Sequence, residues 1–163
     1  MKGKTDLLKE LEVVTKKTAR EILKDAVVCD KKKVINFLLK NGVDVDIRGI
    51  NTGENGSETA LMVASRGDNI DIFKFLLKKG AGINAKDIAG WTSLLWASNT
   101  GNVEIVKLCL KSGANIDKKE INGYTPLMWA SIKGHKEIVK LLCDNGADVS
   151  IKNKKKQTCP NRL

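Results

Sequence analysis

The stretch GYTPLMWA, residues 123–130, decides the fold because the chain repeats its pattern at a fixed distance. TSLLWAS begins at Thr92 and TALMVAS at Thr59, so these two threonines and Thr125 stand 33 residues apart. A second echo follows each of them: DIFKFLLKKGAGIN from residue 71, EIVKLCLKSGANID from 104 and EIVKLLCDNGADVS from 137. This period indicates one supersecondary unit copied along the chain, in which each copy buries its apolar side against a neighbour.

Local signals predict two helices in each unit. Thr125 can accept a hydrogen bond from a free amide at a helix start, and Pro126 follows at the first helical position, where its missing N–H costs nothing. The apolar residues within 138–142 give the stripe of an amphipathic helix, which Gly146 ends by supplying a left-handed backbone. Each unit therefore reads as a turn, a helix of about eight residues, a short link, a helix of about ten residues and a loop.

This pattern resembles the ankyrin repeat family, whose G-x-T-P-L-x-x-A signature is complete at residues 123–130. Gly134 and His135 then open the second helix, as in the family. Other units depart from the signature: Ser93 stands where the family usually has proline, and Asp68 where it has glycine. The resemblance implies an all-α solenoid of paired antiparallel helices, with short β-turn loops and degenerate terminal repeats. It also implies that His135 fastens the loop between the helices of its unit.

The units divide the chain into parts of one ankyrin-repeat domain, residues 1–163. The expected parts are an N-terminal capping helix (1–17), a degenerate repeat 1 (18–48), repeat 2 (54–86), repeat 3 (87–119), repeat 4 (120–152) and a truncated fifth repeat or tail (153–163). Apolar residues within 7–14 are expected to cover repeat 1, and Thr18 with Glu21 forms a capping box. The connection 49–56 carries extra residues and is predicted to protrude as a loop.

The net charge of +10 would suggest nucleic acid if it were concentrated on the repeats. It is not, because residues 1–20 hold six Lys or Arg against three acids, and residues 152–163 hold five against none. We interpret these runs as solvated ends. The seven aromatic residues are not interleaved with a basic stripe, so no platform for stacking bases is evident from the sequence.

The sequence predicts no catalytic chemistry. His135 is the only histidine, and no nucleophile with a base and an orienting group can be assembled around it. The four cysteines form no C-x-x-C pair, which argues against a zinc site or disulfides and suits a reducing, cytoplasmic location. The start of the chain is charged, and no signal peptide or membrane span is expected. We predict a protein that is not an enzyme and has no cofactor and no metal.

Buried and exposed roles can be assigned from the repeat positions. Trp96 and Trp129 occupy equivalent places in the first helices and are predicted to fill the core, while Cys109 and Cys143 are placed on the apolar face of second helices. Trp91 and Tyr124 each stand between a turn glycine and a capping threonine.

The resemblance implies that the place held by Trp91 and Tyr124 points outward on the concave side of the stack, and that turn tips and helix ends contact partners. The predicted partner-binding residues are Trp91, Tyr124, Ile88, Ile121, Glu58, Arg66, Asn99, Ile132 and Lys133. Exposed Trp and Tyr beside isoleucines make an apolar strip of the kind that marks interaction sites. The alternative is that the rings only cover neighbouring loops.

The sequence therefore predicts a protein–protein interaction module that binds a partner protein through its concave turn and helix face. We expect it to be a monomer on its own, with no small-molecule substrate and no contact with a membrane. One alternative is an inhibitory or anchoring arm of a longer protein, and another is a nucleic-acid-associated protein. Added salt would separate the last case, because phosphate binding weakens steeply as salt increases.

Overall fold

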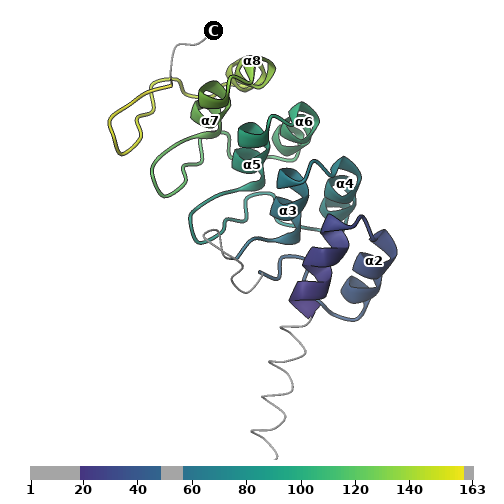
Figure 1. Cartoon of the computed structure of the whole chain (residues 1–163). Helices are drawn as coiled ribbons and strands as arrows, with labels where there is room; N and C mark the ends of the chain where they lie inside the picture. Colours follow the sequence, from purple (N-terminus) through teal and green to yellow (C-terminus); the bar gives the residue numbers. More distant parts are fainter. Residues whose placement is uncertain (1–18, 49–56, 160–163) are drawn as a thin grey trace, which may run out of the picture.

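A computed structural model describes residues 19–48 and 57–159 of the chain (Figure 1). The predicted capping helix 1–17, the capping residue Thr18 and the whole connection 49–56 lie outside the described residues. Within the described ranges the structure is helical and contains no strand. A helical segment at residues 19–28 is followed by α2 (Lys32–Lys40), α3 (Ala60–Arg66), α4 (Ile70–Lys78), α5 (Ser93–Thr100), α6 (Val103–Lys111), α7 (Pro126–Lys133) and α8 (Lys136–Asp144).

The helices form pairs that stack along one axis (Figure 1). The segment 19–28, α3, α5 and α7 form one layer, which we call the inner helices, and α2, α4, α6 and α8 form the outer helices. Long loops project from the inner side, at the left of Figure 1. We call three of them the fingers: residues 86–91, 119–124 and 152–157.

The predicted helix starts are confirmed. The hydroxyl oxygens of Thr59, Thr92 and Thr125 accept hydrogen bonds from the backbone N–H three residues later, at 3.3–3.4 Å. Asn69 and Asn102 cap α4 and α6 in the same way. These bonds satisfy amides that a helix start leaves without an intrahelical partner.

His135 stands at the equivalent place before α8 and does not cap the helix with its side chain. Its Nε2 lies instead 3.1 Å from the carbonyl oxygen of Asn99, in the preceding unit. His135 therefore ties two successive units together, whereas the sequence suggested a link within its own unit.

The buried residues repeat with the 33-residue period. The outer helices α4, α6 and α8 each contribute three of them to the seams between layers and units, and α2 contributes Ile35: Ile72, Phe73 and Leu76 come from α4, Ile105, Val106 and Cys109 from α6, and Ile138, Val139 and Leu142 from α8. Cys109 is buried as predicted, but the prediction for Cys143 is wrong, because this residue is exposed near the end of α8. One residue of offset on a helix of 3.6 residues per turn rotates a side chain by about 100°, which is enough to move it off the buried stripe.

Each finger is closed by a polar side chain at its second residue. A carboxylate oxygen of Asp87 accepts the N–H of Trp91 at 2.8 Å, and a carboxylate oxygen of Glu120 accepts the N–H of Tyr124 at 3.0 Å. In the third finger the amide oxygen of Asn153 accepts the N–H of Gln157 at 2.9 Å. The same kind of bond therefore holds the backbone of the last residue of each finger, and in the first two fingers it positions Trp91 and Tyr124 before the capping threonines.

Candidate interaction face

Four aromatic rings form a continuous row along the inner helices and fingers. The ring centroid of Trp91 lies 4.3 Å from that of Trp96, in a stacked arrangement, and 5.1 Å from that of Trp129. Tyr124 continues the row, 5.2 Å from Trp129. These separations lie in the range at which aromatic pairs attract one another. The row, Trp96–Trp91–Trp129–Tyr124, crosses the seam between the third and fourth units.

The prediction that Trp129 fills the core is wrong, because its side chain is only half-buried. Trp96 is buried, at 6% exposure, as predicted, yet it belongs to the same row. Trp91 and Tyr124 are half-buried, because each packs one ring against the row. The sequence separated two core rings from two surface rings, whereas the structure joins all four.

Two rings of the row keep a polar group without a partner. The indole N–H groups of Trp96 and Trp129 are buried, and neither has an acceptor within the described part of the chain. A buried donor without a partner costs about 1–3 kcal/mol. The row is therefore not arranged for the greatest stability of the free chain.

The second-unit end of the row is closed by an ion pair. The guanidinium of Arg66 lies 5.5 Å from the centre of the Trp96 ring, and it pairs with a carboxylate oxygen of Glu58 at 3.2 Å. Lys24 lies 4.0 Å from the same oxygen. Glu58 was predicted to point outward like Trp91, and this prediction is wrong, because Glu58 is only 9% exposed. A carboxylate at this place turns toward the two cations instead of the solvent.

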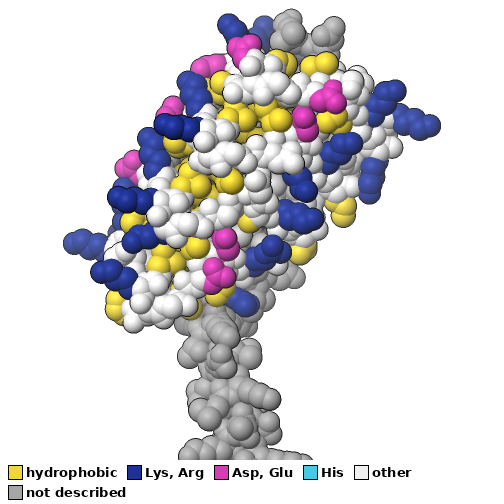
Figure 2. All heavy atoms as spheres, turned by 180° about the vertical axis from the view of Figure 1, so that it is seen from behind, with side chains coloured by type: hydrophobic (Ala, Val, Ile, Leu, Met, Phe, Trp, Pro, Cys, Tyr) yellow, Lys and Arg dark blue, Asp and Glu magenta, His cyan; other side chains and the backbone are white. Residues whose placement is uncertain are grey.

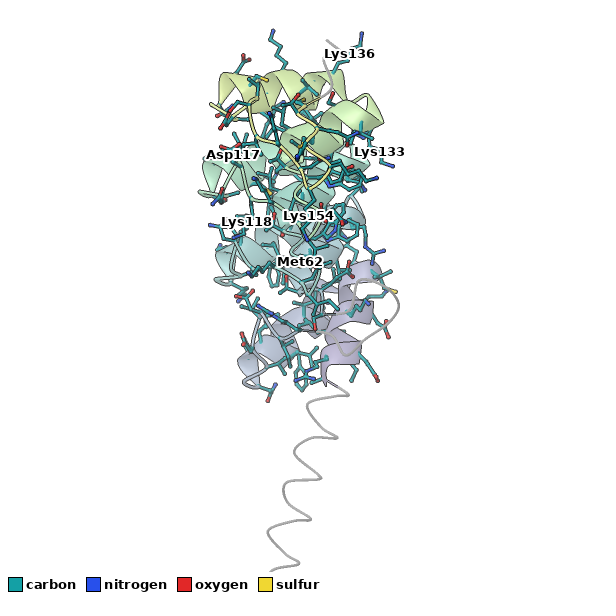
Figure 3. The ribbon with its side chains drawn as sticks, turned by 90° about the vertical axis from the view of Figure 1, so that its left-hand side faces the viewer. Met62, Asp117, Lys118, Lys133, Lys136 and Lys154 are labelled. Atoms are coloured by element: carbon teal, nitrogen blue, oxygen red, sulfur yellow. The ribbon has the colours of Figure 1, made fainter. Side chains whose placement is uncertain are left out.

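The remaining predicted contact residues lie around the row. Ile88 and Ile121, at the finger tips, are exposed at 67% and 57%, and Ile132 and Lys133, at the end of α7, are also exposed. Asn99, at the end of α5, is half-buried, and its carbonyl oxygen faces His135. Figure 3 looks onto this side of the molecule, with Lys133 among the labelled side chains.

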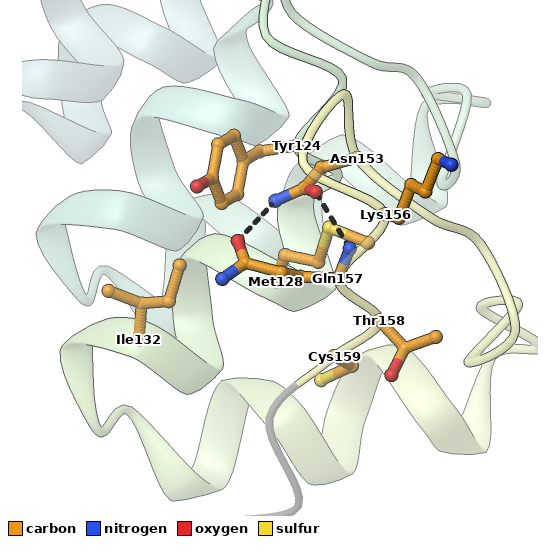
Figure 4. Close-up of a pocket in the computed structure, with 8 residues that line it drawn as sticks. All are labelled: Tyr124, Met128, Ile132, Asn153, Lys156, Gln157, Thr158 and Cys159. Carbon is orange, nitrogen blue, oxygen red and sulfur yellow. Dashed lines mark hydrogen bonds between the residues drawn. The ribbon is translucent and has the colours of Figure 1, made fainter.

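A cleft of about 650 Å³ opens at the end of the row. One wall is formed by Met128 and Ile132 of α7, which are four residues apart and share one side of the helix, and by Tyr124, two residues before the helix begins. The other wall is the third finger and the residues after it: Asn153, Lys156, Gln157, Thr158 and Cys159 (Figure 4). Three hydrogen bonds between Asn153 and Gln157, at 2.9–3.0 Å, hold that wall in shape.

The residues of this second wall were missed from the sequence. Gln157 stands 33 residues after Tyr124 and 66 after Trp91, so the repeat itself carried the signal. Its amide does not suggest an anchor in the way that an aromatic ring does.

The carboxylate that supports Trp91 has an altered acidity. Burial raises the pKa of Asp87 above its usual value, and this effect outweighs the hydrogen bonds from the backbone of Trp91 and Ala89, which lower it. The nearby charge of Glu58 raises the pKa of Asp87 further. A carboxylate oxygen of Asp87 is buried without a partner in the described structure.

The described residues hold no group of three or more His, Cys, Asp or Glu side chains placed to bind a metal ion. Among them, no helix combines the length and the apolar character that crossing a bilayer requires. The side chains of the face are aromatic, aliphatic and basic.

A family model of ankyrin repeats, in three copies, matches residues 1–87 and 61–153 of the chain. No curated protein matches the chain significantly.

Proposed function

The chain belongs to the ankyrin repeat family, and on this basis we propose that it binds another protein through its fingers and inner helices, without catalysing a reaction. Ankyrin repeats are generally protein–protein interaction modules, and the family is typically non-enzymatic. We propose that the binding face consists of the aromatic row, the isoleucines at the finger tips and the cleft beside Tyr124.

One observation carries this proposal, namely that three of the four rings in the row are only half-buried. A row that merely filled the stack would be covered, because apolar area gains stability in proportion to its removal from water. Partly exposed Trp and Tyr beside exposed aliphatic side chains are typical of interaction surfaces. The two indole N–H groups without acceptors support the same interpretation, since unsatisfied buried groups are rare in proteins.

We also propose that the module acts without a cofactor, as a monomer, in the cytoplasm. The four cysteines, Cys29, Cys109, Cys143 and Cys159, are all free thiols. Free thiols in this number suit a reducing compartment.

The test is a capture experiment with three immobilised proteins: the wild type, the Trp91→Ala/Tyr124→Ala variant and a Phe37→Ala control. Phe37 is an exposed aromatic side chain on outer helix α2, away from the proposed face. A partner should be retained by the wild type and the control and lost from the double variant, and circular dichroism should show that all three are folded. A partner that the double variant retains equally would contradict the proposed face.

A further inference from the structure

The exposed charges of the three fingers and of α3, α5 and α7 have one sign. On the three fingers and on α3, α5 and α7, the exposed charged side chains are all Lys or Arg: Arg66, Lys86, Lys119, Lys133, Lys152, Lys154, Lys155 and Lys156. Basic side chains project from the right-hand edge of the molecule in Figure 2, where the fingers lie when it is seen from behind. A partner that approaches the aromatic row from solvent therefore meets cations first.

The acids of these elements are turned inward. Asp87 and Glu120 are buried and accept backbone N–H groups within their own fingers, and Glu58 is buried against Arg66. The negative charges of Asp87 and Glu120 compensate in part the positive charges of Lys86 and Lys119. In the third finger Asn153 replaces the carboxylate, while the number of lysines rises to four in residues 152–157. The uncompensated positive charge is thus concentrated at the end of the face that carries the cleft.

The outer helices show a different pattern. There the exposed acids Asp71, Glu104 and Glu137 recur with the lysines Lys74, Lys107 and Lys140, each at the 33-residue period. The ammonium group of Lys107 lies 3.8 Å from a carboxylate oxygen of Glu137. The outer helices therefore expose acids among their lysines, although their lysines still outnumber their acids, whereas the fingers, α3, α5 and α7 expose no acid. This difference was hidden when charge was counted along the sequence. At the other end of the inner layer, Glu21 and Asp25 are exposed on the segment 19–28. The charge of the face therefore changes from mixed at this end to positive at the end that carries the cleft.

The positive charge surrounds an apolar opening. Lys156 lines the cleft together with Tyr124, Met128 and Ile132, and Lys133 directly follows Ile132 at the end of α7. An apolar side chain can enter this cleft while carboxylates next to it in the partner's sequence face the lysines. Exposed charges at the rim of an interface act mainly on the association rate and on the choice of partner.

Nucleic acid is the other polyanion that such a surface could attract, but the rings do not suit it. Binding of single strands relies on aromatic faces that are free to stack on bases. Trp91 packs against both Trp96 and Trp129, and the guanidinium of Arg66 lies over Trp96. The rings of Trp91 and Trp96 are stacked on each other, and Trp129 packs at a tilt against Trp91 and Tyr124, so the rings already pack against one another.

We propose that the face takes an acidic protein segment that carries apolar side chains, with its acidic end over Lys154–Lys156 and an apolar side chain in the cleft beside Tyr124. This inference rests on the proposed function and adds the chemistry and the direction of the partner.

The experiment pans a displayed library of random linear peptides against the full chain. Peptides are counted only if they bind the wild type and lose binding to the Trp91→Ala/Tyr124→Ala variant, which removes peptides attracted by net charge alone. The counted peptides should be enriched in Asp and Glu around Leu, Ile, Phe or Trp. Their affinity should fall by about tenfold or more in Lys154→Glu/Lys155→Glu, and it should weaken as salt is added.

The matched control is Lys74→Glu/Lys140→Glu on the outer helices, which changes the net charge by the same amount. It should leave the affinity within about twofold, because exposed charges beyond a Debye length of about 8–10 Å are largely screened. Equal losses in both charge variants would overturn the proposal in favour of general attraction to a basic protein. A single-stranded thymidine oligonucleotide that binds more tightly than the best peptide would overturn it in favour of nucleic acid.

The same experiment separates this inference from the proposed function. Neutral or basic peptides that still depend on Trp91 and Tyr124 would leave the interaction face intact and refute its acidic partner. Peptides that ignore both rings, or a failure to select any peptide, would count against the face itself.

Discussion

The ring of Trp91 lies 5.1 Å from that of Trp129, across the seam between the third and fourth units. The indole of Trp91 thus contributes both to the surface and to the contact between neighbouring units. The substitutions below separate these two contributions.

Removing the ring of Trp91 should cost stability as well as binding. Aromatic pairs contribute about 0.5–1.5 kcal/mol each beyond the burial of area, and Trp91 makes two such contacts, with Trp96 and Trp129. We expect Trp91→Ala to lower the free energy of unfolding by about 1–3 kcal/mol and to weaken partner binding by roughly 2 kcal/mol or more. Urea unfolding gives the first quantity and titration of the partner the second. Normal binding by the folded variant would remove Trp91 from the contact residues.

The two tryptophans on the inner helices should differ in their effect on stability. Trp96 is buried and Trp129 is half-buried, so truncation to alanine removes more covered surface at Trp96. We expect Trp96→Ala to cost about 3–5 kcal/mol and Trp129→Ala clearly less. Urea titrations of the two variants, followed by far-ultraviolet circular dichroism, test this order. The reverse order would mean that Trp129 is the ring that holds the seam together.

Replacing Asp87 should change how stability depends on pH. Because burial raises the pKa of Asp87 in the folded chain, the folded state keeps a proton that the unfolded chain has already released. The stability that this retained proton contributes is fully present below the pKa of Asp87 in the unfolded chain. It is lost as the pH rises through the pKa of Asp87 in the folded chain. Asp87→Asn cannot titrate, so its stability relative to the wild type should increase as the pH rises from about 3 to about 7.

Asn153 indicates that the Asp87→Asn variant will fold, because its amide oxygen already accepts the equivalent N–H, from Gln157, at 2.9 Å. The measurement is the free energy of unfolding of both proteins at several pH values, in which the titration of the other acids cancels. A difference that stays flat across this range would show that the acidity of Asp87 is the same in the folded and unfolded chain.

The position of the His135 ring should make Gly101 intolerant of a side chain. A Cβ added at Gly101 would lie 2.6 Å from Cε1 of His135, and the backbone there has a φ of +90°. At Gly134 the φ is +76°, but no atom lies within 4 Å of an added Cβ. Gly134→Ala should therefore cost about 1–2 kcal/mol from the left-handed backbone alone, and Gly101→Ala more.

The contribution of the ring can be isolated with a third protein. In the double variant Gly101→Ala/His135→Ala, the clash is absent and the added cost of Gly101→Ala should largely disappear. Thermal melts of the single and double variants measure this coupling. Purely additive effects would show that His135 moves aside freely and does not fix the seam.

The cysteines should react in an order set by burial. Burial raises the pKa of the Cys109 thiol to about 12, whereas Cys29 and Cys143 are exposed. Only the thiolate attacks iodoacetamide, so at about pH 8 the native chain should be modified at Cys29 and Cys143 well before Cys109. Peptide mass spectrometry over time gives the order, and denaturant should abolish the delay. Equally fast labelling of Cys109 in the native chain would mean that α6 opens readily.

The period and the capping threonines predicted the helix pairs, because each depends on a few residues that are near one another in the sequence. Predictions of side-chain orientation from repeat position failed where a side chain is positioned by residues that are distant in the sequence. Glu58 turns inward because Arg66 and Lys24 are within reach, and neither cation shares its turn. Trp129 is half-buried and packs at a tilt against Trp91 and Tyr124, an arrangement that no repeat position encodes by itself.

Counting charges along the sequence also did not reveal that the fingers expose only basic side chains. Counting along the chain treats Asp87 and Lys86 as a neutral pair, whereas folding buries the acid and exposes the lysine. Only the direction of each side chain separates a charge that a partner meets from one that the finger uses for its own hydrogen bonds.

The backbone bonds between successive fingers have a mechanical consequence. The N–H of Ile121 donates to the carbonyl of Ala89 at 2.7 Å, and that of Lys154 to the carbonyl of Asn122 at 2.9 Å, so within the described chain each finger is joined to the next by one such bond. The helical seams behind them are packed with side chains. The helices form the stiff side of the stack, and the fingers form the side that is joined by few bonds. Such a stack bends most easily toward or away from its fingers. Small changes in curvature, shared among the units, would let this face match partners of different width without melting any helix.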